Sequence, residues 1–145
     1  MPEQETVERA REDAREGKSP STQAGEFVRE EMHHVREGKH GARSPQQAIA
    51  IGLSKARRAG VKLGTPKGSA GLRKKAAQDE KASKKPHRKV STTRSRATEA
   101  ALKREPHSSA SKKALSRQAK TAAAKRGKPA RREAAMKAAR TRKAA

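Results

Sequence analysis

Positively charged side chains are the residues of this sequence best suited to chemistry. The chain of 145 residues has 38 lysines and arginines against 15 aspartates and glutamates, a net charge of +23. Lysine and arginine bind phosphate, and this excess is larger than solubility alone requires. With one phenylalanine and no tryptophan or tyrosine, the chain cannot stack bases on aromatic rings. We therefore expect binding to the phosphate backbone of double-stranded DNA, with RNA as the alternative.

The charge is unevenly distributed along the chain. Residues 1–37 contain ten acidic and six basic residues, residues 38–64 contain six basic and no acidic residues, and residues 65–145 contain 26 basic and five acidic residues. Such asymmetry is typical of an interaction tail on a small folded unit. The cations predicted to contact nucleic acid are Lys39, Arg43, Lys55, Arg57, Arg58, Lys74, Lys75, Lys84, Lys85, Arg88, Lys89, Arg94, Arg96, Lys103, Arg104, Lys112, Lys113, Arg117, Lys120, Lys125, Arg126, Arg131, Arg132, Lys137, Arg140, Arg142 and Lys143.

A second candidate phosphate site lies in the turn 38–44. Lys39, His40 and Arg43 precede a predicted helix, whose opening N–H groups could hold a phosphate together with them. The two glycines of this turn are weaker evidence than the glycine-rich loop of nucleotide-binding proteins. We prefer the simpler interpretation, a turn with exposed cations.

Two adjacent histidines, His33 and His34, are candidate metal ligands. Neighbouring residues of a helix point about 100° apart, so the two imidazoles cannot bind one ion together. Glu30 with His34, and His33 with Glu37, have the i, i+4 spacing of a ligand pair. The chain has no cysteine, and we predict solvent-exposed histidines, no metal site and no cofactor.

The sequence also argues against catalysis and against a membrane span. Nothing in it assembles a nucleophile, a general base and oxyanion donors, so we predict that the protein is not an enzyme. No apolar run approaches the length of a signal sequence or a membrane-spanning helix. We expect a cytoplasmic protein associated with the nucleoid.

The clearest helix signals lie in residues 44–60. Ser44 can cap the first turn, Pro45 suits the first helical position, and Gln47 can complete a capping box. Apolar residues recur at helical spacing around Leu53. We therefore expect this helix to organise the folded part of the chain.

We predict an all-α protein with four segments. Residues 1–18 form a polar N-terminal helix, residues 19–64 a helical hairpin, residues 65–92 a basic linker, and residues 93–145 a tail rich in lysine, arginine and alanine. Low hydrophobicity and repulsion between cations predict that the long basic tail is largely disordered, with transient helices. The hairpin has few large apolar residues, and a homodimer through it would bury more of them.

Two stretches resemble a known family. They are residues 19–44 and residues 47–60, and the second contains the core Gln-Ala-Ile-Ala-Ile-x-Leu-Ser-x-Ala-Arg. They resemble a bacterial family of small basic proteins with no established function, some of whose members are labelled plasmid stabilisation protein. The resemblance extends over residues 1–64 and supplies no catalytic residues. It implies a function connected with DNA.

The leading hypothesis is a non-enzymatic, largely sequence-independent DNA-binding protein of histone-like, nucleoid-associated or plasmid-maintenance type. An RNA- or ribosome-associated basic protein would use the same charge. A third hypothesis is an antitoxin-like regulator, in which the acidic residues of 1–37 bind another protein.

Overall fold

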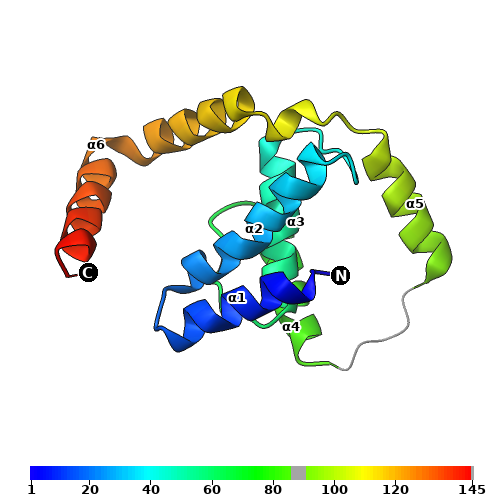
Figure 1. Cartoon of the computed structure of the whole chain (residues 1–145), viewed down its shortest axis with the longest axis horizontal. Coiled ribbons are helices and arrows are strands. Elements are labelled where there is room, and N and C mark those ends of the chain that lie inside the picture. Colours follow the sequence, from blue (N-terminus) through cyan, green and yellow to red (C-terminus); the bar gives the residue numbers. More distant parts are fainter. Residues whose placement is uncertain (86–90, 145) are drawn as a thin grey trace. The chain divides into compact units, whose positions relative to one another are not determined.

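The computed structural model describes residues 1–85 and 91–144. Their helices are α1 (Gln4–Arg15), α2 (Pro20–Arg36), α3 (Pro45–Arg58), α4 (Ala70–Ser83), α5 (Thr92–Lys103), a short 3₁₀ helix η1 (Ser108–Ala110) and α6 (Lys112–Ala144) (Figure 1). None of these helices has the length and apolarity needed to cross a membrane. The chain divides into two compact units, Met1–Ala110 and Ser111–Ala145, here called the N-terminal and C-terminal units.

The prediction of a long, largely disordered tail is wrong. Helices α4, α5 and α6 extend through the described part of residues 65–145. Alanine supplies 11 of the 33 residues of α6, and alanine, lysine and arginine all favour helix. Repulsion between two cations one turn apart costs only about 0.2–0.5 kcal/mol. Intrinsic propensity therefore outweighs the repulsion that we expected to keep the tail disordered.

The N-terminal unit is built around α2. Helix α1 packs on α2, α3 packs on α2 elsewhere along its surface, and η1 contacts both α2 and α3 (Figure 1). The largest fully buried side chains are Phe27, Glu31, Val35 and Thr6, so two of the four are polar. Polar contacts must therefore supplement a small apolar core, which comprises Ala10, Ala24, Phe27 and Ala56 with Val7, Leu53, Val61 and Leu63 packed against it.

Helix α3 presents a face of small residues to α2. Its buried residues are Ala48, Gly52 and Ala56, whereas Leu53, the centre of the predicted apolar face, is only partly buried. A Cβ atom on Gly52 would lie 2.7 Å from the Cα atom of Val28. The two helices therefore approach each other backbone to backbone at this point.

Helix α4 lies within residues 65–92, the interval predicted as a basic linker. It is capped by Ser69 and packs against α3. Its buried residues are Ala76 and Asp79, and the Oγ of Ser54 on α3 donates a hydrogen bond to Asp79 (2.7 Å). A docking face made of one alanine and one aspartate has no apolar periodicity, so the hydrophobic pattern of the sequence does not predict this helix.

The last turn of α5 and the residues that follow it hold the turn between α2 and α3. The N–H of Gly41 donates to the carbonyl of Leu102 (2.9 Å), and the N–H of Ala42 donates to the carbonyl of Pro106 (3.0 Å). A Cβ atom on Gly41 would lie 1.8 Å from the carbonyl oxygen of Glu105, so only glycine fits here. These contacts fix the backbone of the turn that carries His40.

We expect the substitution Gly52→Ala to destabilise the protein by about 1–3 kcal/mol, the usual cost of overpacking. The added Cβ meets the backbone of α2, so the helices must separate. This cost exceeds the gain in helix propensity, which is about 1 kcal/mol. Urea unfolding followed by far-ultraviolet circular dichroism measures the difference.

Gly25→Ala is the matched control, because Gly25 also lies within a helix but has no atom within 4 Å of the position of its Cβ. This variant should be as stable as the wild type, or more stable by up to about 1 kcal/mol. Equal stability of the two variants would contradict the close contact between the backbones of α2 and α3 at Gly52.

Candidate nucleic-acid interface

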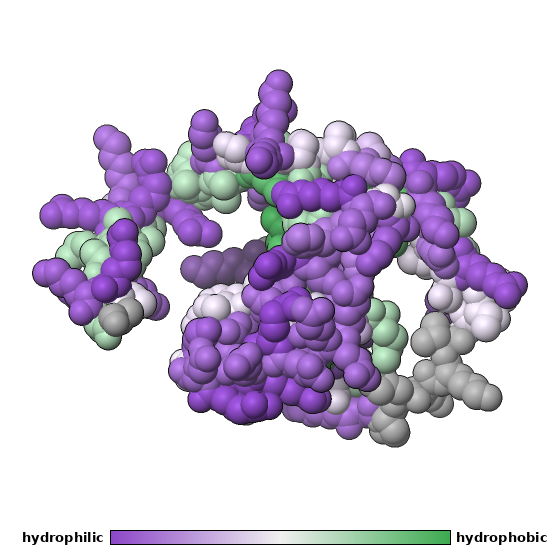
Figure 2. All heavy atoms as spheres, in the orientation of Figure 1, coloured by the Kyte–Doolittle hydropathy of each residue, from purple (hydrophilic) through white to green (hydrophobic). Residues whose placement is uncertain are grey.

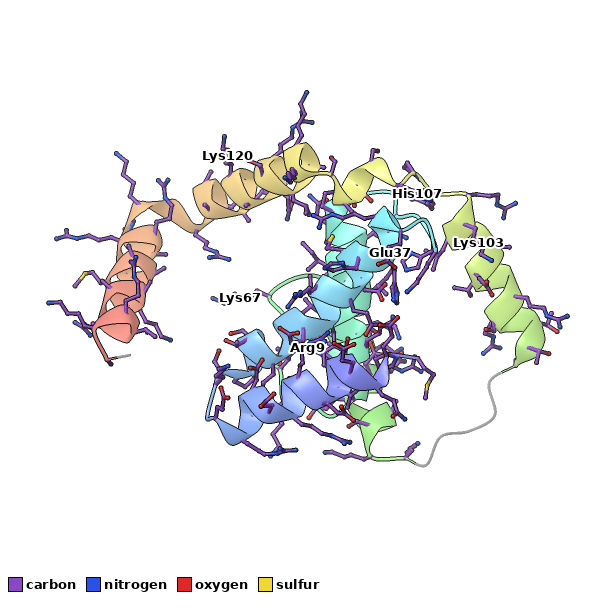
Figure 3. All side chains as sticks on the ribbon, viewed as in Figure 1. Arg9, Glu37, Lys67, Lys103, His107 and Lys120 are labelled. Carbon is purple, nitrogen blue, oxygen red and sulfur yellow. The ribbon has the colours of Figure 1, made fainter. Side chains whose placement is uncertain are left out.

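The C-terminal unit concentrates unpaired positive charge. Residues 111–145 contain 13 lysines and arginines and one acid, Glu133. Helix α6 has no buried residues, and Figure 3 shows its side chains projecting on several sides. Every ion pair found among the described residues lies within the N-terminal unit. The cations of the C-terminal unit are therefore available to an external anion.

Gly127 divides α6 into two helical segments. Its φ of 76° is in the left-handed region, and Pro129 follows two residues later. At about 100° per residue, the cations Arg131, Arg132, Arg142 and Lys143 fall within an arc of about 120°, and Glu133 lies outside it. With a rise of about 1.5 Å per residue, this strip is about 18 Å long, which corresponds to about five phosphates along one DNA strand.

All 12 predicted contact residues of the C-terminal unit are exposed. Lys128, which the prediction omitted, is exposed as well. The 12 predicted residues are Lys112, Lys113, Arg117, Lys120, Lys125, Arg126, Arg131, Arg132, Lys137, Arg140, Arg142 and Lys143.

The turn 38–44 directs two of its three predicted phosphate ligands toward protein groups. The Nζ of Lys39 lies 3.2 Å from carboxylate oxygens of both Glu37 and Glu3. Hydrogen bonds to these two carboxylates raise the pKa of Lys39 above its ordinary value. His40 is largely buried, with its ring facing Glu31. The side chain of Lys39 is nevertheless 52% exposed, whereas that of His40 is only 15% exposed.

The N-terminus of α3 is capped by its own side chains. The Oγ of Ser44 accepts from the N–H of Gln47 (3.3 Å), and the Oε1 of Gln47 accepts from the N–H of Arg43 (2.7 Å). In a capping box the side chain of Gln47 would accept from the N–H of Ser44, the N-cap residue. Here it accepts from the N–H of Arg43, one residue earlier. The side chain of Arg43 is 81% exposed. The turn fits our simpler interpretation, in which it presents an exposed cation to solvent.

Lys55 is a predicted nucleic-acid contact that the structure places in the protein interior. Its side chain is 21% exposed, and its Nζ pairs with Glu30 (3.0 Å) and with Glu31. Burial acts to lower the pKa of Lys55, but the hydrogen bonds to Glu31 and Glu30 outweigh it and raise the pKa above its ordinary value. Because Lys55 is held between two carboxylates, we leave it out of the interface.

Three other predicted contacts on the N-terminal unit form ion pairs with nearby carboxylates. Arg58 and Lys75 lie 3.7 Å and 2.8 Å from the same oxygen of Asp79, and Lys103 lies 2.7 Å from Glu99. Seven more predicted contacts on this unit are exposed or partly exposed: Arg57, Lys74, Lys84, Lys85, Arg94, Arg96 and Arg104. Figure 2 shows that hydrophilic residues cover most of the face in view. The predicted contacts Arg88 and Lys89 lie outside the described residues.

The structure brings together three potential metal ligands that were not predicted as a group from the sequence. His33 is exposed as predicted, but the side chain of His34 is only 13% exposed and does not pair with Glu30. His34 instead faces Glu31, three residues earlier, and His40 joins them from the turn. The i, i+3 spacing of Glu31 and His34 was visible in the sequence, whereas the approach of His40 depends on the fold.

Comparison with known protein families shows that residues 15–67 match a family of unknown function, DUF6496. The matched residues contain α2, the following turn and α3, which are the elements that form the buried ion pairs. The match agrees with the resemblance to a family that has no established function. No curated protein and no solved structure matches the chain.

We expect the substitution Lys55→Met to lower the free energy of unfolding by about 2 kcal/mol or more, because it leaves two buried carboxylates without their cation. Thermal and urea unfolding measure the loss. Its effect on DNA affinity, measured at a temperature where the variant is folded, should be small.

Lys62→Met is the matched control, since Lys62 is an exposed lysine just beyond α3. It should change stability by less than about 0.5 kcal/mol. Equal stability of the two variants would show that Lys55 does not hold α2 and α3 together.

Proposed function

We propose that this protein is a non-enzymatic DNA-binding protein of nucleoid-associated or plasmid-maintenance type, which binds the phosphate backbone of duplex DNA with little sequence preference. The observation that supports the proposal best is the C-terminal unit, with 13 cations, one acid and no buried residue in its helix. Its cations have no carboxylate partner within the described part of the unit. Binding to a polyanion supplies their counterions and releases those condensed on the DNA.

The composition of α6 favours contact with the backbone over reading of bases. Direct readout relies on asparagine, glutamine and arginine placed to contact base edges. Helix α6 contains one glutamine and no asparagine. Its alanines are small, so the helix axis can come close to the sugar-phosphate backbone while the lysines and arginines reach the phosphates on either side.

The charges of the N-terminal unit are arranged differently. Eight of the ten acidic residues of 1–37 form ion pairs inside this unit. This arrangement favours a stabilising role for the acids and weighs against an antitoxin-like surface for a basic partner. We propose that the N-terminal unit is a folded docking or dimerising module to which the DNA-binding unit is attached.

Binding should depend steeply on salt and hardly on sequence. If about six to ten cations contact phosphates, a plot of log affinity against log salt concentration has a slope of about −5 to −9. Fluorescence anisotropy with labelled duplexes of unrelated sequence, at several salt concentrations, measures both properties. A slope shallower than about −3, or a preference above about 1000-fold for one duplex, would contradict the proposal. Tighter binding to duplex RNA would favour the RNA-associated alternative.

Changing the arginines of the C-terminal unit tests whether charge alone carries binding. Replacing all six with glutamine should make the salt slope shallower by about 3–5, because up to six phosphate contacts are lost. Glutamine favours helix about as well as arginine, so circular dichroism should be preserved. The six residues are Arg117, Arg126, Arg131, Arg132, Arg140 and Arg142.

Replacing the same six arginines with lysine is the matched control. Lysine keeps the charge but lacks the planar guanidinium with which arginine forms its fixed, two-pronged hydrogen bonds. The lysine variant should keep the salt slope and most of the affinity. If it lost binding as severely as the glutamine variant, arginine geometry would matter and the protein would read its target more specifically.

A further inference from the structure

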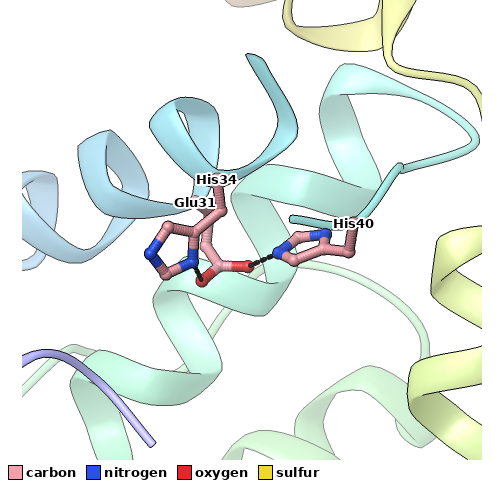
Figure 4. A group of neighbouring side chains, drawn as sticks. All are labelled: Glu31, His34 and His40. Carbon is pink, nitrogen blue, oxygen red and sulfur yellow. Dashed lines mark ion pairs between the residues drawn. The ribbon is translucent and has the colours of Figure 1, made fainter. Parts of the chain in front are cut away.

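Three potential metal ligands converge in the N-terminal unit (Figure 4). Glu31 and His34 lie one turn apart on α2, and His40 lies in the turn before α3. The Nδ1 of His34 is 3.8 Å from the Oε1 of Glu31, and the Nε2 of His40 is 3.4 Å from its Oε2. One ligand atom from each residue lies within 4.8 Å of the others. A carboxylate and two imidazoles thus meet in one small volume.

The outer nitrogen of each imidazole already has an acceptor. The Nε2 of His34 donates to the Oε1 of Glu3 (2.9 Å), and the Nδ1 of His40 donates to the carbonyl oxygen of Gly41 (3.0 Å). An ionised carboxylate and a carbonyl oxygen only accept hydrogen bonds, so these nitrogens carry the protons. In the neutral imidazoles the inner nitrogens therefore present lone pairs toward Glu31. Outer acceptors orient the histidine ligands of metal sites in this way.

The carboxylate of Glu31 supplies a buried oxygen that lacks a hydrogen-bond partner. Its side chain is 1% exposed, and its Oε2 has no hydrogen-bond donor among the described residues. Lys55 pairs with the other oxygen, Oε1. A buried carboxylate oxygen that faces an imidazole lone pair is unfavourable unless a proton or a cation lies between the two atoms.

We propose that Glu31, His34 and His40 form a binding site for a divalent transition-metal ion, with zinc as the best fit. Two imidazoles and one carboxylate are an established zinc ligand set, whereas magnesium and calcium prefer oxygen ligands alone. Two ligand atoms on a tetrahedral zinc ion with bonds of about 2.0–2.1 Å lie about 3.4 Å apart. The Nε2 of His40 and the Oε2 of Glu31 already have this separation, so His34 moves most when the ion binds.

The ion binds Oε2 of Glu31 and leaves Oε1 to Lys55. Glu3, Glu30, Glu31 and Glu37 bring four negative charges to this region, and Lys39 and Lys55 bring two positive charges. A divalent ion changes the local sum from −2 to 0, the same change that protonation of both imidazoles would produce. Two protons and one metal ion are therefore the competing occupants, and the experiment must separate them.

Metal binding connects parts of the chain that are distant in sequence. It joins α2 to the turn before α3 and, through Glu3, to the residues that begin α1. Because the unfolded chain does not assemble this ligand set, binding stabilises the folded state. This role does not depend on phosphate binding by the C-terminal unit, so either proposal can fail without the other.

The test uses the untagged full-length protein, stripped of metal by a chelator and titrated with zinc chloride in a calorimeter. We expect one equivalent to bind and the unfolding temperature to rise with zinc concentration. Cobalt(II) in place of zinc should give the visible absorption of a four- or five-coordinate site. These wild-type measurements need no variant that could misfold.

His40→Ala should weaken zinc binding by more than about 100-fold, since even the loss of an outer-shell partner costs about 10–100-fold. His33→Ala is the matched control, because His33 neighbours His34 on α2 but is exposed and lies outside the ligand group. It should bind zinc like the wild type. Absence of zinc binding by the wild type, or equal affinity of the two variants, overturns the proposal. Imidazole nitrogen shifts that show both rings doubly protonated in the presence of zinc would assign the site to protons and overturn it as well.

Discussion

The N-terminal unit depends on the ion pairs that Lys55 of α3 makes with Glu30 and Glu31 of α2. Burial acts to raise the pKa of Glu30, but hydrogen bonds from Lys55, Thr6 and the N–H of Glu3 outweigh it and lower the pKa below its ordinary value. An unpaired buried charge costs several kcal/mol, so these groups must meet for the unit to fold. The requirement fixes how α2 and α3 are rotated toward each other.

The small-residue contact at Gly52 acts together with these ion pairs. Gly52 lies three residues before Lys55 on α3, and Val28 lies shortly before the glutamates on α2, so the backbone contact and the ion pairs occupy neighbouring turns. Phe27 is the one phenylalanine of the chain, which has no tryptophan or tyrosine. The packing of this unit is therefore specified by glycine and buried charge more than by large apolar side chains.

Helix positions were predictable because their end signals are local. Ser44 and Pro45 begin α3, and Gly127 interrupts α6. These residues favour helix ends through their own backbone and side-chain geometry, without any contact distant in sequence. What could not be predicted depends on partners distant in sequence. The docking of α4 depends on Asp79 meeting Ser54, and the inward direction of Lys55 depends on the glutamates of α2. Sequence alone shows a lysine on an exposed-looking helix and gives no sign of which carboxylate it will meet.

The same distinction applies to function. Counting lysines and arginines treats every cation as a phosphate ligand, yet the fold neutralises some of them and leaves others unpaired. Acidic residues are concentrated in the N-terminal unit, where they pair with Lys39, Lys55, Lys75 and others, while the C-terminal unit has one acid for 13 cations. Pairing is partial in the N-terminal unit, because its residues 1–110 contain 25 lysines and arginines against 14 acids, and this unit therefore keeps some attraction for a polyanion. The described cations of the C-terminal unit have no carboxylate partner inside it, which is the arrangement expected of a unit that binds a polyanion. The separation of paired from unpaired cations, more than the net charge of +23, is therefore the physical basis for proposing that α6 binds nucleic acid.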